Sequence, residues 1–148
     1  MIKVMVTSVV LAQKQSKPPI LIGWLKRDGP SFNADYTKPT KDGPNDHGFD
    51  FFFGMNGTTV GSPLVLMENR LVTETPTIKG PKKGRPMAKS YRPVEVIPKP
   101  TEEVLKYIDR AAQKPEPFFI YYAMTAVHTP VVPAKRFAGI SSFRSMTP

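Results

Sequence analysis

Every position of the segment Phe118–Tyr122 carries a bulky apolar or aromatic side chain. A strand with one face in water alternates apolar and polar residues, whereas a strand that is covered on both faces is apolar throughout. The pattern therefore predicts a central strand of an α/β sheet. Phe119 and Tyr121 are expected on one face, and the other three residues on the opposite face.

A helix is predicted over Glu102–Gln113. Thr101 is a residue type favoured at N-caps, and Pro100 before it argues against an earlier start. Apolar residues recur at helical spacing and predict one buried stripe, made of Val104, Leu105, Ile108, Ala111 and Ala112. A helix followed by a buried strand is half of a βαβ unit, which implies a mostly parallel sheet with flanking helices.

Elsewhere the pattern predicts shorter elements. Pro63–Val72 is predicted to be a strand, Gly29–Gly61 is rich in turn-forming pairs, and Lys79–Lys99 has the proline and charge content of a linker. Met1–Ala12 has a short basic start, an apolar run and a small-residue end, as export leaders do; an edge strand is the alternative interpretation. A leader would make the protein exported or periplasmic, and otherwise we expect it to be cytoplasmic.

Charge changes this picture in one segment. The net charge is +9, and Lys79–Lys99 contains seven basic residues against one acid, Glu95. Such a segment suits nucleic acid or another anionic partner. Nucleic acid is disfavoured because Tyr91 is the one aromatic residue within the segment. A polyanionic glycan and a solvated loop without a partner both stay open.

Composition sets further limits. The 148 residues suit one domain, and 17 prolines are more than twice the average share. The chain has no cysteine and therefore no disulfide. It contains no run of 18 apolar residues, so a membrane-spanning helix is not expected.

Three ordered segments carry motifs: Pro117–Pro133 reads PFFIYYAMTAVHTPVVP, Asp42–Gly54 reads DGPNDHGFDFFFG, and Pro63–Thr77 reads PLVLMENRLVTETPT. In this order they resemble the PFFxYxxxTAxHTPxxP pattern, the GPxxxGFDxFxG segment and the ENxRxTExPT hairpin of the type I sulfatases. That family includes arylsulfatases and N-acetylgalactosamine-6-sulfatase-like enzymes. The resemblance covers Gly23 to Ser141 and implies part of an alkaline-phosphatase-like α/β sandwich.

The resemblance also implies three substrate-binding residues. His128 corresponds to the histidine that contacts the sulfate group in the family, and it follows the predicted strand directly. Thr58 and Thr59 lie near the position where related enzymes contact the substrate. By the resemblance, the partner is a sulfated carbohydrate or an aryl sulfate.

The family's catalytic apparatus is missing from the sequence. Its nucleophile is a formylglycine made from a C/S-x-P-x-R motif, and this chain has no cysteine and no Ser-x-Pro-x-Arg. The Asp-Asp and Asp-Asn pairs that hold the family's calcium ion are absent too. The expected function is therefore a sulfuric ester hydrolase, with this chain a truncated or internally deleted form that is inactive alone.

These features divide the chain into three parts: residues 1–22 as leader and first strand, residues 23–141 as a partial sulfatase catalytic domain, and residues 142–148 as an unmatched tail. The alternative function is a non-catalytic basic module that binds sulfated glycans or other polyanions. The sequence does not define an oligomeric state.

Overall fold

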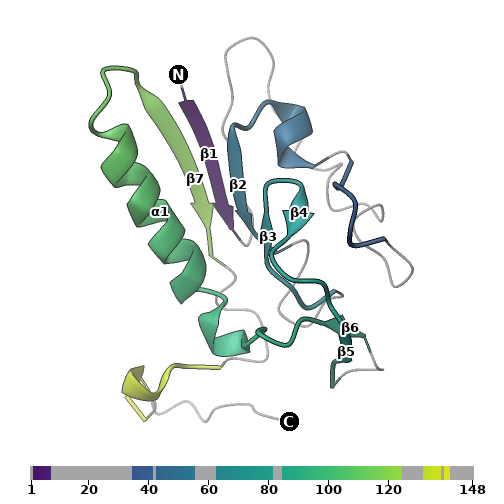
Figure 1. The fold of residues 1–148 in the computed structure, drawn as a ribbon. Helices are drawn as coiled ribbons and strands as arrows, with labels where there is room; N and C mark the ends of the chain where they lie inside the picture. Colours follow the sequence, from purple (N-terminus) through teal and green to yellow (C-terminus); the bar gives the residue numbers. More distant parts are fainter. Residues whose placement is uncertain are drawn as a thin grey trace.

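The parallel part of the sheet is built from segments that lie far apart in the sequence. The computed structural model describes residues 2–7, 35–41, 43–55, 63–81, 85–124, 132–137 and 139–140, with the backbone alone for residues 2–7. Its larger sheet has the strand order β4-β3-β2-β1-β7. Strands β2 (Phe51–Gly54) and β7 (Phe118–Ala123) both run parallel to β1 (Ile2–Thr7), which lies between them (Figure 1). The carboxyl ends of β2 and β7 therefore lie at the same edge of the sheet.

Strand β1 has a neighbour on each side. It falls within Met1–Ala12, for which a leader was predicted and an edge strand was the alternative. Ile2–Thr7 is a strand, but it lies inside the sheet, so the edge position is wrong. The leader stays a prediction.

Strand β2 supplies side chains to both faces of the sheet. Phe52 is completely buried and packs with Phe49 and Met67. Its neighbour Phe53 points to the opposite face, as side chains alternate along a strand, and packs against the helix. Full burial of a phenylalanine contributes about 1.5–3 kcal/mol relative to exposure, so these two residues fix β2 between two apolar layers.

Strands β3 (Met67–Glu68) and β4 (Leu71–Val72) form a hairpin that pairs antiparallel with β2. The segment Pro63–Val72 was predicted as one strand, and this is wrong because the chain reverses at residues 69 and 70. Asn69 adopts a φ of 52°, in the left-handed region that asparagine tolerates better than most residues. The reversal therefore has a local cause in the sequence.

Hydrogen bonds join this hairpin to η1 (Pro44–His47), a short 3₁₀ helix. The Asn69 Oδ1 atom accepts from the Phe52 N–H at 3.0 Å and from Asn45 Nδ2 at 3.3 Å. The Arg70 guanidinium pairs with Asp46. Segments 43–54 and 63–77, both of which carry the family resemblance, are therefore packed directly against each other.

Helix α1 (Pro98–Ala111) starts and faces differently from the prediction. Pro98 and Pro100 both lie in its first turn, where the backbone N–H groups need no helical acceptor, so Pro100 does not exclude an earlier start. Thr101 is inside the helix, and its hydroxyl donates to the carbonyl of Ile97 at 2.7 Å. The predicted N-cap is therefore wrong.

The buried face of α1 consists of four residues: Pro100, Val104, Tyr107 and Ala111. Of the predicted stripe, Val104 and Ala111 are buried, whereas Leu105 is 55% exposed and Ile108 is 37% exposed. The sheet lies against one side of the helix (Figure 1). The predicted stripe included residues that follow the buried ones by one position, such as Leu105 after Val104 and Ile108 after Tyr107, and these two are exposed.

Strand β7 is not the central, doubly buried strand that was predicted. Within the described residues it pairs with β1 alone and ends the sheet. Ile120 and Tyr122 pack on the side of α1, and Phe118 makes an edge-on contact with Tyr107, with ring centroids 6.2 Å apart. On the other face, Phe119 is 46% exposed. The predicted division of the side chains between two faces is confirmed, but the predicted burial is wrong. Within the described residues, Ala123 packs against the cluster of Phe49, Phe52 and Met67, whereas Phe119 and Tyr121 are exposed on the same face.

The described residues of the segment Lys79–Lys99 are folded, so the linker prediction is wrong. The segment contributes to β5 (Ile78–Lys79) and contains β6 (Pro86–Met87), which pair antiparallel, and the 3₁₀ helix η2 (Pro93–Glu95). It buries Ala88, Tyr91 and Val96 in a cluster with Met55, Leu64 and Val65. A third short helix, η3 (Lys135–Phe137), lies near the carboxyl terminus. The linker prediction rested on the many prolines and charged residues of the segment. It overlooked the few apolar residues, Ala88, Tyr91 and Val96, that anchor the segment in the core.

Candidate functional site

The three predicted substrate-binding residues, Thr58, Thr59 and His128, lie outside the described residues. The strands before them are described. Gly54 ends β2 and Ala123 ends β7, and β1 separates the two strands. In open α/β sheets, ligands bind beyond the carboxyl ends of parallel strands. The predicted residues thus follow two strands that end at the edge where ligands are expected.

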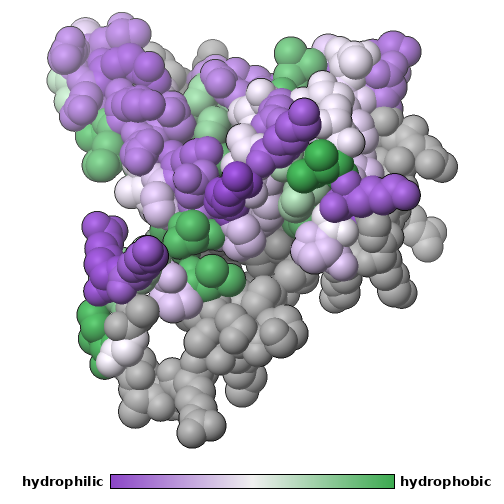
Figure 2. Space-filling view, turned by 60° about the horizontal axis from the view of Figure 1, so that its bottom comes forward, coloured by the Kyte–Doolittle hydropathy of each residue, from purple (hydrophilic) through white to green (hydrophobic). Residues whose placement is uncertain are grey.

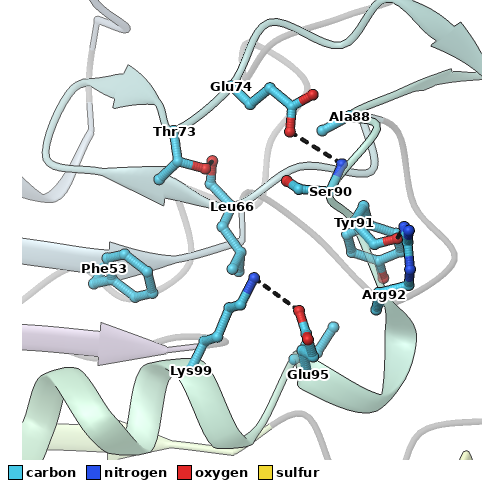
Figure 3. Close-up of a pocket in the computed structure, with 11 residues that line it drawn as sticks. Phe53, Leu66, Thr73, Glu74, Ala88, Ser90, Tyr91, Arg92, Glu95 and Lys99 are labelled. Atoms are coloured by element: carbon cyan, nitrogen blue, oxygen red, sulfur yellow. Dashed lines mark hydrogen bonds and ion pairs between the residues drawn. The ribbon is translucent and has the colours of Figure 1, made fainter.

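A pocket of about 400 Å³ lies near this edge, within the size range of small-molecule sites. Four segments converge on it: the end of β2, the segment around the β3–β4 hairpin, the turn before η2, and the start of α1 (Figure 3). They contribute apolar residues to its floor and polar residues to its rim, except that the ammonium of Lys99 lies toward the middle (Figure 3). The apolar residues are Phe53, Leu66, Ala88, Tyr91 and Val96. The polar residues are Thr73, Glu74, Ser90, Arg92, Glu95 and Lys99.

Glu74 is fixed on one side of the rim by the turn at residues 89 and 90. Its two carboxylate oxygens accept the N–H groups of Lys89 and Ser90, at 2.9 and 3.1 Å. Hydrogen bonds from Ser90, first from its side chain and then from its backbone, hold the pKa of Glu74 below its usual value. The negative charge of Glu74 is therefore compensated locally by hydrogen-bond donors.

Glu95 and Lys99 face each other across the junction of η2 and α1. Lys99 Nζ lies 2.7 Å from Glu95 Oε2, and both side chains are 40% exposed. Figure 3 shows the Lys99 ammonium in the middle of the pocket, beside Leu66. An ion pair with this exposure contributes about 0.2–1 kcal/mol, so it is easily exchanged for another contact.

Arg92 is oriented by the backbone of the same turn. Its Nη1 atom donates to the carbonyl of Lys89 at 2.7 Å and to the carbonyl of Tyr91 at 2.8 Å. These two bonds fold the guanidinium back onto the turn. Arg92 therefore adds positive charge to the rim while it stabilises the turn that holds Glu74.

Tyr91 closes the pocket with a buried ring. Burial raises the pKa of Tyr91 to about 12, so the phenol stays protonated at neutral pH. Its hydroxyl lies 4.0 Å from the sulfur of Met55. Tyr91 thus has the environment of a core residue and not that of a general acid or base near pH 7.

No three His, Asp or Glu side chains come together within the described part of the chain. Asp46, which lies within the resembling segment Asp42–Gly54, pairs with Arg70 and accepts the Gly43 N–H at 2.9 Å. The oxygens of this carboxylate are therefore already occupied by protein donors.

The pocket residues were missed because they come from four separate stretches of sequence. A local signal existed for one pair: Glu95 and Lys99 are four residues apart, the spacing of neighbours on a helix. That signal was hidden by the prediction that Pro100 precedes the helix. No sequence pattern connects Glu74 to Ser90, sixteen residues later.

Comparison with models of known protein families gives no match for this chain. The sequences of curated proteins give none either. Within the described residues, no helix is both long and apolar enough to cross a membrane.

Proposed function

We propose that this chain carries part of the catalytic domain of a sulfuric ester hydrolase of the arylsulfatase type, and that the chain alone binds sulfate esters without hydrolysing them. The partner is a sulfated carbohydrate or an aryl sulfate. The proposal originates in the ordered motifs of the sequence, and His128 is the residue expected to contact the sulfate group.

The observation that supports it most is the arrangement of β2 and β7. Both strands belong to resembling segments, both run parallel to β1, and both end at one edge of the sheet. Loops that follow such strands are the usual location of ligand-binding residues in α/β proteins. Asn69 and Arg70 also contact the 43–54 segment, so two of the resembling segments pack together as one unit.

No turnover is expected of the chain alone, because covalent catalysis of this type needs an activated nucleophile. The chain contains neither a cysteine nor a Ser-x-Pro-x-Arg sequence from which a formylglycine could be made. Purified protein should therefore release no 4-nitrophenol from 4-nitrophenyl sulfate above the rate without protein. Release that persists through a second, orthogonal purification, and that scales with the concentration of this chain, would contradict the proposal.

A second candidate is a non-catalytic basic module that binds sulfated glycans. Lys79, Lys89 and Arg92 are exposed, and they lie on or near the pocket rim and the β5–β6 hairpin. Hydrophilic side chains cover much of the described surface at this end of the molecule (Figure 2). The net charge of +9 would attract polyanions over a distance.

Chromatography on immobilised heparin and on duplex DNA tests the second candidate. Retention on heparin at a salt concentration that releases the protein from DNA would support it, because both matrices are polyanions and the difference isolates glycan recognition. Equal elution from both would show a general effect of charge and would contradict the candidate.

A further inference from the structure

The pocket combines an apolar floor with one ammonium group at its centre. Phe53 and Val96 are buried and line the pocket. The Lys99 side chain reaches toward Leu66, with its ammonium beside Glu95 (Figure 3). Lys99 belongs to the first turn of α1, which two prolines restrain. The helix therefore fixes the backbone of Lys99, and the Lys99 ammonium lies in a pocket with apolar walls.

The pocket lining carries two acidic and two basic side chains: Glu74, Glu95, Arg92 and Lys99. Glu74 is already compensated by the donors of residues 89 and 90. Glu95 is the partner of Lys99, and both groups are half-exposed. The surrounding segment Lys79–Lys99 is strongly basic. An incoming anion can therefore share Lys99 with Glu95 or replace it, and the field of the protein attracts that anion.

We propose that this pocket binds a small organic monoanion, an apolar ring or short chain that bears one acidic group, with the acidic group on Lys99 Nζ and the apolar body over Phe53 and Val96. Glu95 competes with the ligand for the ammonium and sets the affinity. The volume of about 400 Å³ suits a ligand of one ring. None of these residues is among those assigned to sulfate in the proposed function, so the inference does not depend on it.

The test is a titration followed by NMR of ¹⁵N-labelled protein, with sodium benzoate as the probe. Phenyl sulfate serves as a second arm that distinguishes a carboxylate from a sulfate ester, and benzyl alcohol serves as the uncharged analogue. We expect benzoate to shift the amide signals of Ala88 and Val96, which line the pocket, with saturation. Benzyl alcohol should bind at least about tenfold more weakly, since a charge-assisted hydrogen bond is lost.

Four variants make the test specific. K99M removes the ammonium but keeps an apolar stem, and should weaken benzoate binding at least about tenfold. E95Q removes the competitor and should strengthen binding about twofold to fivefold, a gain that unfolding cannot produce. Lys106 and Glu103 form a matched ion pair on the same helix, at 2.7 Å and outside the pocket. K106M and E103Q should therefore leave the affinity within about twofold.

Three results from the variants and the uncharged analogue would each overturn the proposal: equal losses in K99M and K106M, an unchanged affinity in E95Q, or benzyl alcohol that binds as tightly as benzoate. A fourth comes from the sulfate ester. If phenyl sulfate binds and benzoate does not, the pocket selects sulfate esters, and the proposal of a general organic monoanion is overturned. Thermal melts of K99M and E95Q that match the parent protein establish that both variants are folded.

Discussion

Two strands of the larger sheet, the middle strand β2 and the last strand β7, place the same residue type in opposite environments. Phe52, in β2, is completely buried, whereas Phe119, in β7, is 46% exposed. Both belong to short runs of aromatic β-formers. The difference is produced by neighbours: the β3–β4 hairpin and η1 pack against β2, whereas in the described residues β7 has β1 on one side and α1 on one face (Figure 1). An apolar run thus indicates a strand but does not determine how deeply the strand is buried.

In the described residues, side-chain hydrogen bonds and an ion pair also join the hairpin to its neighbours. Asn69 joins the hairpin to Phe52 and Asn45, and Arg70 joins it to Asp46. At the other end, the hydroxyls of Thr101 and Tyr122 lie within hydrogen-bond distance and connect α1 to β7. Hydrophobic side chains also reach the surface between hydrophilic ones in the view of Figure 2. We therefore expect mutations at the hairpin end to destabilise the protein more than equivalent mutations on the exposed face of β7.

The largest difference is expected between two phenylalanine-to-alanine variants. Phe52→Ala leaves a cavity beside Phe49 and Met67 and should lower the free energy of unfolding by about 3–5 kcal/mol. Phe119→Ala removes a half-exposed ring and should lower it by less than about 1.5 kcal/mol. Urea denaturation followed by circular dichroism measures both. Equal losses would show that the outer face of β7 is covered in solution.

An intermediate effect is expected at Asn69. Asn69→Ala removes the side-chain oxygen that accepts from the Phe52 N–H. It also places alanine at a φ of 52°, a conformation that alanine tolerates less well than asparagine does. The loss should be about 1–3 kcal/mol, because a backbone donor loses its partner. Asn69→Gly loses the same acceptor but adopts this φ freely, so it should be less destabilised than Asn69→Ala. If the two variants were equally stable, backbone conformation would have no part in the effect.

The smallest effect should depend on pH. Burial alone would raise the pKa of Asp46, but the Arg70 guanidinium and the Gly43 N–H together hold it below the usual 3.8. A lowered folded-state pKa means that the unfolded chain binds the proton more tightly, so the contribution is present above about pH 4 and is lost as the pH falls through the folded-state value. Asp46→Asn should thus cost under about 1 kcal/mol at pH 7 and less at pH 3. A cost that grew on acidification would contradict this sign.

The sequence predicted that β7 and α1 exist and how the β7 side chains divide between two faces. These features depend on local periodicity, which a sequence shows directly. It did not predict the exposure of Phe119 or the true buried face of α1, since these depend on which elements cover them. The start of α1 was missed because Pro100 was taken as a barrier, although the first turn of a helix accepts proline. The pocket could not be predicted, because Glu74, Ser90 and Lys99 meet only after the chain has folded.

The most direct test of the proposed function is the affinity for phenyl sulfate in a pair of histidine variants. The chain has two histidines, His47 and His128, so His47→Ala is the matched control. Both variants are made in a K99M background, so that the pocket at α1 does not contribute. Isothermal titration then reports binding at the predicted sulfate contact.

We expect His128→Ala to weaken phenyl sulfate binding at least about tenfold, as for the loss of a charge-assisted hydrogen bond, while His47→Ala leaves it unchanged. Both variants should keep the melting temperature of the K99M protein to within a few degrees, in line with about 1 kcal/mol or less for a surface change. Equal affinities in the two variants, or no binding in the K99M background itself, would contradict the assignment of His128 and with it the proposal of a sulfate-ester site.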